Sequence, residues 1–358
     1  MYRLILICVF TMLPLIAVAQ EDELAEPAAE PRTAKEMIAA AYKISKNAES
    51  ERELGEVIEL LDQALRGDGL TPSQTEYARK LKGWSHNRIG EAFVKLGRDP
   101  AALKQFELAV ELNENHWKAR HNRGVSYAIG GELEKALADF DATIRLNGGY
   151  ANAWFNRGEI RYKLEELDAA LNDYSRALQL DPEDAGFYLA RGHVFHQRRA
   201  YGNALTDYNR AVQFDPEAAE AYVYRGEAFA ELGDYDRAAE DYRRAVQLDN
   251  TLGTAYRSIA WLMATCPEER FRETDRALAA AKKAIELDGS DHFQYVQTLA
   301  AAYANAGQFE QAQEDQQKAI ELAEGQATED QLQMLRSAMQ QYEQQQPYRQ
   351  ERVARRLR

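Results

Sequence analysis

Two histidines, His193 and His196, are the residues whose types and spacing come nearest to a chemical site. Three residues apart on a helix, they would share one face and could bind a metal ion together. Glu159 and Glu227 stand 34 residues before and after His193 and could supply carboxylate ligands. Such a pair with distant acids is a weak metal signal. We therefore expect no metal and no cofactor, and metal binding or catalysis at the two histidines stays as an alternative.

Other residue types that catalyse reactions are poorly placed for it. Cys266 has no base at a matched spacing. The sequence also lacks a nucleophile with its base, a phosphate-binding loop and a closed set of metal ligands. It therefore predicts a protein that is not an enzyme.

Four arginines and four aspartates recur together every 34 residues, and each aspartate follows its arginine by 16 residues. The pairs are Arg123 with Asp139, Arg157 with Asp173, Arg191 with Asp207, and Arg225 with Asp241. Because an unpaired buried charge is costly, matched charges predict structural ion pairs between two helices. The alternative is a stripe of arginines that binds an acidic ligand.

Small and aromatic residues follow the same period and indicate the elements that hold these charges. The register contains Gly90, Gly124, Gly158, Gly192 and Gly226, then an alanine 12 residues later and an aromatic residue four further on. A fixed period of this length is typical of stacked helix-turn-helix repeats. A glycine inside a helix costs about 1 kcal/mol relative to alanine, so we expect the two helices of each repeat to touch there.

Residues 151–184 give the clearest copy of the repeat, with Trp154-Phe155-Asn156-Arg157-Gly158, Ala170, Tyr174, Ala177 and Asp181-Pro182. This pattern resembles the tetratricopeptide repeat. The resemblance implies an all-α fold, a right-handed superhelical solenoid of antiparallel helix pairs. It also implies a concave surface that binds peptides or partner proteins, without naming the partner.

The repeats predict the following organisation. A signal peptide (1–19) and a flexible acidic linker (20–32) precede a degenerate helical hairpin with a lead-in helix (33–82). Seven repeats cover 83–322, with windows 83–116, 117–150, 151–184, 185–218, 219–252, 253–292 and 293–324. A capping helix (325–346) and a basic tail (347–358) follow. Gln316 replaces the register aromatic of the last repeat, which suits a terminal repeat that faces solvent.

The family register also predicts which side chains line the concave groove and bind a peptide. They are Trp84, Asn87, Lys118, His121, Asn122, Asn152, Phe155, Asn156, Glu159, Tyr162, Leu189, His193, His196, Tyr224 and Glu227. Asparagine and tyrosine suit a groove that hydrogen-bonds an extended backbone and stacks on its side chains. The alternative is an inner face that is merely solvated.

Charge and the N-terminal sequence bear on partners and location. The net charge is −14 and the pI about 5.1, so nucleic acid is not expected as a partner. An apolar run from Leu4 to Ala19 ends in Ala17-Val18-Ala19, which predicts a cleaved signal and export to the periplasm or the extracellular space. The tail Arg349–Arg358 is interpreted as solvated, and the alternative is a membrane-associated assembly factor whose tail contacts anionic lipid weakly. The predicted function is a non-enzymatic scaffold that binds a protein or peptide.

Overall fold

The computed structural model describes residues 33–351, and within this range the regular structure is helical, with no strand. The predicted signal peptide, the acidic linker and residues 352–358 of the tail lie outside the described residues. The chain divides between Pro182 and Glu183 into two compact units. Within the described range, no helix has the length and apolar character needed to cross a membrane.

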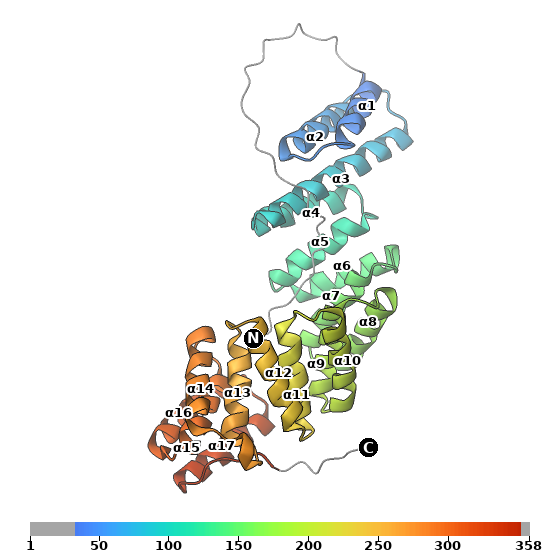
Figure 1. Ribbon diagram of the computed structural model, residues 1–358. Helices are drawn as coiled ribbons and strands as arrows, with labels where there is room; N and C mark the ends of the chain where they lie inside the picture. The colour runs from blue at the N-terminus through green and yellow to red at the C-terminus, as the bar shows by residue number, and fades with distance from the viewer. Residues whose placement is uncertain (1–32, 352–358) are drawn as a thin grey trace. The chain divides into compact units, whose positions relative to one another are not determined.

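Unit 1 is a stack of helices in which each helix packs against the next one in sequence (Figure 1). Its helices are α1 (Ala34–Ser45), α2 (Glu51–Arg66), α3 (Pro72–Lys95), α4 (Asp99–Leu112), α5 (Trp117–Ile129), α6 (Leu133–Leu146), α7 (Ala151–Lys163) and α8 (Leu167–Leu180). Capping boxes begin the first three helices, as Thr33 with Glu36 shows for α1. The helices α3, α5 and α7 also contact one another in succession, because each is the first helix of a repeat.

The predicted boundary between residues 82 and 83 falls inside α3. The lead-in helix and the first helix of the first repeat form one continuous helix from Pro72 to Lys95. Gly83 lies in its interior, where a Cβ atom would stand 2.9 Å from the Ala109 carbonyl oxygen. The glycine therefore serves close packing against α4, and it does not end the helix.

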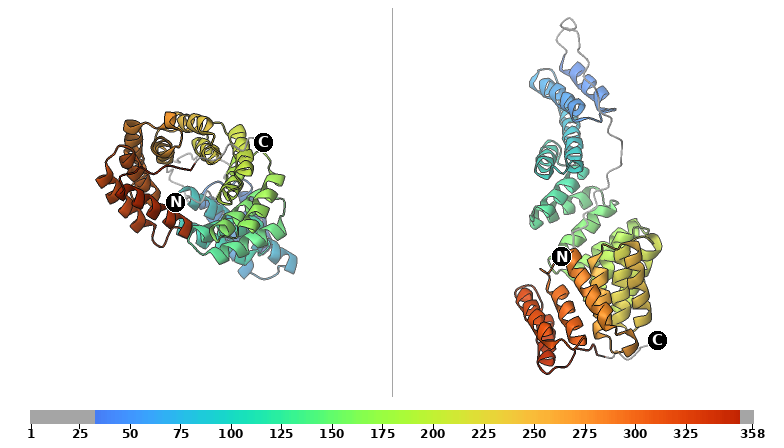
Figure 2. Two further views of the ribbon diagram at one scale, coloured as in Figure 1. Left: turned by 90° about the horizontal axis from the view of Figure 1, so that it is seen from below. Right: turned by 60° about the vertical axis from the view of Figure 1, so that its left-hand side comes forward.

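Unit 2 continues the same pattern of helix pairs (Figures 1 and 2). Its elements are α9 (Ala185–Gln197), α10 (Tyr201–Phe214), α11 (Ala219–Glu231), α12 (Tyr235–Leu248), α13 (Gly253–Thr265), the 3-10 helix η1 (Glu269–Phe271), α14 (Thr274–Asp288), α15 (Phe293–Asn305), α16 (Phe309–Ala323) and α17 (Glu329–Glu343). The first helices α9, α11, α13 and α15 contact one another in succession. We call the surface of α3, α5 and α7 the first-helix face of unit 1, and that of α9, α11, α13 and α15 the first-helix face of unit 2.

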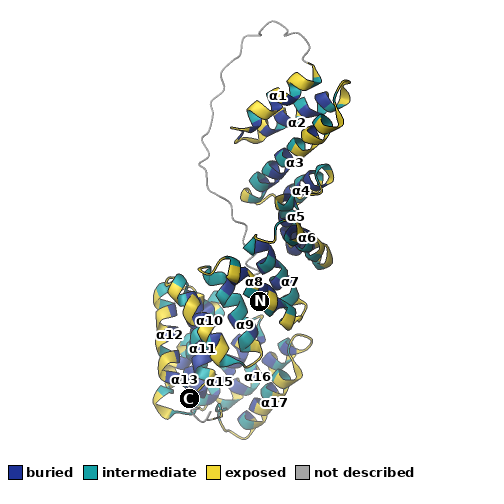
Figure 3. Cartoon of the chain, turned by 90° about the vertical axis from the view of Figure 1, so that its right-hand side faces the viewer, coloured by how far each residue is buried: buried dark blue, intermediate teal, exposed yellow. Residues whose placement is uncertain are grey.

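The register glycines bring the two helices of a repeat together. A Cβ atom on Gly158 would stand 2.7 Å from Cε1 of Tyr174, and one on Gly192 would stand 2.5 Å from Cε1 of Tyr208. Both tyrosines are buried. Figure 3 colours the buried residues of each helix dark blue. The aromatic ring of the second helix therefore fills the space that each glycine leaves, which is the packing reason that the sequence predicts.

Helix α17 corrects the expectation for the last repeat. Gln316 is fully buried, and its side-chain amide donates a hydrogen bond of 2.8 Å to the Leu335 carbonyl oxygen on α17. The capping helix covers the position, so the residue does not face solvent. Thr328 and Gln331 form the capping box that begins α17.

Candidate binding face

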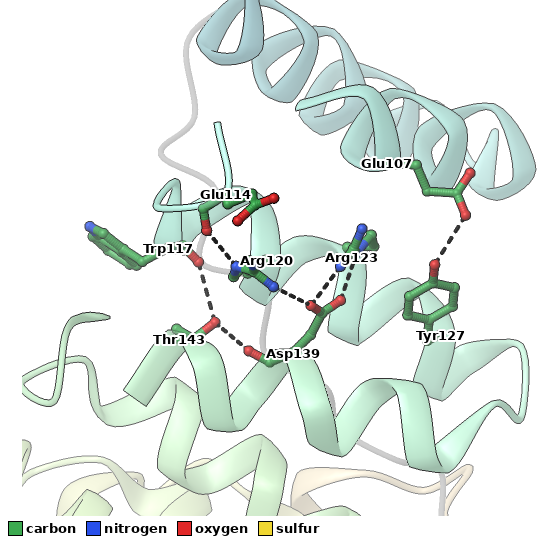
Figure 4. Close-up of polar contacts among 8 residues, drawn as sticks. All are labelled: Glu107, Glu114, Trp117, Arg120, Arg123, Tyr127, Asp139 and Thr143. Atoms are coloured by element: carbon green, nitrogen blue, oxygen red, sulfur yellow. Dashed lines mark hydrogen bonds and ion pairs between the residues drawn. The ribbon is translucent and has the colours of Figure 1, made fainter. Parts of the chain in front are cut away.

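Each predicted arginine–aspartate pair joins the two helices of one repeat. Arg123 on α5 contacts Asp139 on α6 through two hydrogen bonds, Nε to Oδ2 at 2.7 Å and Nη2 to Oδ1 at 2.8 Å (Figure 4). The other three pairs, Arg157 with Asp173, Arg191 with Asp207, and Arg225 with Asp241, have the same two-bond geometry. The aspartates are between 1% and 5% exposed. These guanidinium groups therefore have buried protein partners, as the structural interpretation requires.

Further polar contacts surround the first of these pairs, as Figure 4 shows. Arg120 approaches Asp139 at 3.4 Å and donates to the Glu114 carbonyl oxygen at 2.6 Å. The Tyr127 hydroxyl donates to Glu107 on α4 at 3.0 Å. The hydrogen bond to Asp139 raises the pKa of Arg123 because it favours the charged guanidinium. Side-chain hydrogen bonds therefore connect α5 to α4 and to α6.

A chain of hydrogen bonds links the three first helices of unit 1. The Asn156 amide on α7 donates to Nε2 of His121 on α5 at 2.9 Å. Nδ1 of His121 lies 3.5 Å from Oδ1 of Asn122, whose own amide donates to Asn87 on α3 at 3.0 Å. Asn87 in turn donates to Glu91 at 2.8 Å. Burial lowers the pKa of His121 to about 4, so its imidazole is neutral and can accept the hydrogen bond from Asn156.

Several predicted groove residues are therefore closed off from a ligand, which corrects the expectation that they line an open surface. The buried members of the set are Asn87, His121, Asn152, Phe155 and Asn156, none more than 8% exposed. The Phe155 ring packs on Tyr174 with centroids 5.8 Å apart. Trp84 is partly buried against Ile89 and Phe93. The family register gives the face on which a residue stands, but adjacent first helices pack closely enough to cover part of that face.

Five predicted residues keep exposed surface in unit 1, namely Trp84, Lys118, Asn122, Glu159 and Tyr162. The Glu159 carboxylate accepts a 2.6 Å hydrogen bond from the Tyr174 hydroxyl. Burial raises the pKa of Glu159 despite this hydrogen bond, because the surroundings disfavour the charged form. Burial and the Glu159 charge together raise the pKa of Tyr162. The two residues stand three apart on α7 and so share one face of the helix.

In unit 2 the predicted residues Leu189, His193, His196, Tyr224 and Glu227 are all partly exposed. The His193 ring stands edge-on to Tyr224, with centroids 4.1 Å apart. Burial lowers the pKa of His193 to about 3, so this imidazole is neutral. His196 packs on Tyr201, and its buried Nε2 has no hydrogen-bond partner. Across residues 33–351 no group of three or more His, Cys, Asp or Glu side chains could hold a metal ion.

Two residues of α13 bind the carboxylate of Glu227. Its carboxylate accepts hydrogen bonds from Arg257 at 2.6 Å and from the Ser258 hydroxyl at 2.9 Å. The groove prediction omitted Arg257, Ser258 and Trp261, although all three occupy the same register row as the predicted residues. Extending that row into the sixth repeat would have identified them.

The basic tail begins with residues that pack on unit 2. Arg349 donates to the Ala264 carbonyl oxygen at 2.7 Å and to Oδ1 of Asn305 at 2.9 Å. The Gln350 amide donates to the Thr265 carbonyl oxygen at 3.0 Å. This corrects the interpretation of the tail Arg349–Arg358 as solvated for its first two residues, Arg349 and Gln350, which bond to the protein itself. The remaining arginines of the tail lie outside the described residues.

The repeat geometry agrees with comparisons to known proteins. Family models described as tetratricopeptide repeat or TPR repeat match residues 87–151, 158–198, 192–233, 219–252 and 293–326, together more than half of the chain. The chain belongs to the tetratricopeptide repeat proteins. A comparison with the curated proteins finds no match.

Several solved structures are similar to this chain, and two of those described below are of tetratricopeptide repeat (TPR) proteins. Pseudomonas aeruginosa pilF is 16% identical with a TM-score of 0.53, and the match covers 61% of this chain and 96% of that chain. A TPR protein from Parabacteroides merdae is 20% identical with a TM-score of 0.48, covering 75% and 98%. YrrB, a TPR protein with an unusual peptide-binding site, is 19% identical with a TM-score of 0.44, covering 55% and 96%. At these identities the likeness concerns the fold alone.

Proposed function

We propose that this TPR protein is a non-enzymatic scaffold that binds a protein or peptide on its first-helix faces. The observation that carries the proposal is the partly buried carboxylate of Glu159 on the first-helix face of unit 1, three residues before the partly exposed Tyr162 on α7. Burial raises the pKa of Glu159, which means that the charged carboxylate is destabilised in the protein alone. A cation from a ligand would stabilise the charged form.

Glu159 differs from the two glutamates at the equivalent register position. Glu91 pairs with Arg88 at 3.3 Å, and Glu227 pairs with Arg257 at 2.6 Å. Among the described residues, no arginine or lysine forms an ion pair with Glu159. The ligand class that fits is a peptide with a lysine or arginine for Glu159 and an apolar or aromatic group for Tyr162. The acidic net charge of the chain favours the same basic ligands.

The test is selection of peptides from a displayed random library against the full chain. Selected peptides should be rich in lysine and arginine, and their affinity is measured by fluorescence anisotropy. Glu159→Gln should weaken binding by about tenfold or more, since it removes the charge but keeps the shape. Glu134→Gln, an exposed glutamate on α6, is the matched control and should bind as wild type does. Binding that is equal in all three proteins would refute the proposal, as would a selection that yields no binder.

We also propose that the protein is exported, on the strength of the apolar segment Leu4–Ala19 and the Ala17-Val18-Ala19 motif. A basic peptide or protein in the periplasm or outside the cell would then be the partner. The alternative of a membrane-associated assembly factor relies on arginines that contact lipid. Arg349 instead bonds to α13 and α15, which does not favour that alternative.

A further inference from the structure

The C-terminal end of α13 differs from that of the other first helices in unit 2. After α11, the amides of Leu232, Gly233 and Asp234 bond back to the last turn, where they reach the carbonyl groups of residues 228, 229 and 230. After α13, the additional residues Cys266–Arg270 lead the chain away through η1. The backbone amides that follow α13 reach the carbonyl groups of residues 262 and 263. The carbonyl groups of Ala264 and Thr265 therefore require hydrogen-bond donors from elsewhere in the chain.

The extended segment after α17 supplies both donors. Arg349 bonds the Ala264 carbonyl oxygen at 2.7 Å, and the Gln350 amide bonds the Thr265 carbonyl oxygen at 3.0 Å. The second guanidinium nitrogen reaches Oδ1 of Asn305, the last residue of α15, at 2.9 Å. The partial negative charge at the C-terminal end of a helix attracts the Arg349 guanidinium, although burial and the neighbouring charge of Arg272 lower the pKa of Arg349.

An aromatic contact completes the recognition. The Tyr348 ring lies 5.9 Å from the Trp261 ring, between centroids, with the planes tilted by 36°. It also packs on the cluster that contains Ala300, Ala304 and Tyr342. One extended tripeptide therefore uses an aromatic ring, a guanidinium group and a backbone amide against the first-helix face of unit 2, the three features by which peptide grooves recognise a ligand.

We propose that Trp261, the α13 carbonyl groups and Asn305 form a binding site for an extended aromatic–arginine segment of a partner protein, and that Tyr348-Arg349-Gln350 is its built-in competitor. The inference rests on the proposed function and names the ligand class for unit 2. A segment tethered to its own site has an effective concentration in the millimolar range, so it excludes weaker ligands until a stronger partner displaces it.

The experiment uses a labelled synthetic peptide with the sequence of residues 345–351 and the full chain. In the test variant, Tyr348→Ala and Arg349→Ala are combined to free the site. Arg336→Ala, an exposed arginine on α17, is the matched control. By fluorescence anisotropy the peptide should bind the test variant about tenfold or more tighter than it binds wild type or the control. Adding Trp261→Ala to the test variant should abolish binding.

Two results would overturn the proposal: a test variant with a wild-type circular dichroism spectrum that does not bind the peptide, or equal binding to all proteins. If the test variant does not fold, hydrogen exchange on wild type decides. The Gln350 amide should exchange well before the amides of α15, and exchange only on global unfolding would show that the segment is a permanent part of the fold. Peptides that depend on Glu159 provide the separate check, since they would still bind if this inference alone were wrong.

Discussion

At the scale of single residues, the repeat is held together by a glycine that meets a ring and an arginine that meets an aspartate. The glycine allows contact between the paired helices, and the bidentate ion pair fixes their rotation. Both devices act between helices of one repeat. The glycine contact and the ion pair therefore stabilise the fold, and their effect on the free energy of unfolding can be measured without any ligand.

Gly158→Ala should destabilise the protein. Its Cβ atom would stand 2.7 Å from Cε1 of Tyr174, a buried ring that must shift. Overpacking of this kind costs about 1–3 kcal/mol. Gly55→Ala on α2 is the control, because nothing lies within 4 Å of its Cβ position, and it should stabilise by about 0.5–1 kcal/mol. Urea unfolding measures both, and a Gly158→Ala protein as stable as wild type would contradict the packing role.

Asp241→Ala should cost about 3 kcal/mol, because it leaves the Arg225 guanidinium group without its buried partner. Replacing both residues, as Arg225→Met with Asp241→Leu, should restore most of the loss. A double-mutant cycle from urea unfolding gives the coupling. If the double variant is no more stable than the single one, the two residues do not act as a structural pair.

At the scale of elements, successive first helices of unit 1 are joined by the hydrogen-bond chain through Asn156, His121, Asn122 and Asn87. Side chains of the predicted groove thus connect one repeat to the next. Glu159 stands at the register position of Glu91 and Glu227 but lacks the arginine partner that each of them has, so we propose it as the group left for a ligand.

His121 makes this junction sensitive to pH. Burial holds its pKa at about 4, below the value of about 6.5 in an unfolded chain. The unfolded state therefore binds more protons as the pH falls from 6.5 towards 4, and the free energy of unfolding should drop by about 1.4 kcal/mol per pH unit. His121→Gln removes this titration, so its stability should change by about 2 kcal/mol less between pH 7 and pH 5. Equal pH dependence of the two proteins in urea unfolding would show that His121 is not held neutral.

At the scale of the whole molecule, the two proposed binding surfaces belong to separate compact units. In unit 1 the surface centres on Glu159 and Tyr162, and in unit 2 on Trp261 and the end of α13. The described residues contain no grouping that would favour a metal site over this use. An acidic chain with two such surfaces is suited to hold basic segments of a partner.

If the protein is exported as proposed, its basic partner would be found in the periplasm or outside the cell. Protein recovered from the exported fraction should begin after Ala19 by intact mass spectrometry, because Ala17-Val18-Ala19 fits a signal peptidase. Replacing Ala17 and Ala19 by lysine should leave the precursor uncleaved. A wild-type protein of full precursor mass would contradict the cleavage prediction.

Much of the fold follows from the sequence, and less of the site does. The 34-residue register predicted the helix pairs, the glycine contacts and the four ion pairs, because each depends on residues within one repeat. It did not predict that His121 and Asn156 are buried, since the hydrogen bond between them joins neighbouring repeats. The register also predicted a solvent-facing Gln316, because it gives no information about contacts with α17. Helix α17 covers this residue.

The sequence by itself determined that this protein is a stack of TPR helix pairs, because a periodic pattern of local contacts repeats in every copy. Which side chains remain open to a ligand, and that residues 348–350 lie against α13, became apparent from the packing of the helices. Arg349 and Ala264 are 85 positions apart, and their contact occurs once. A contact that is neither local nor repeated leaves no period in the sequence, so packing alone reveals it.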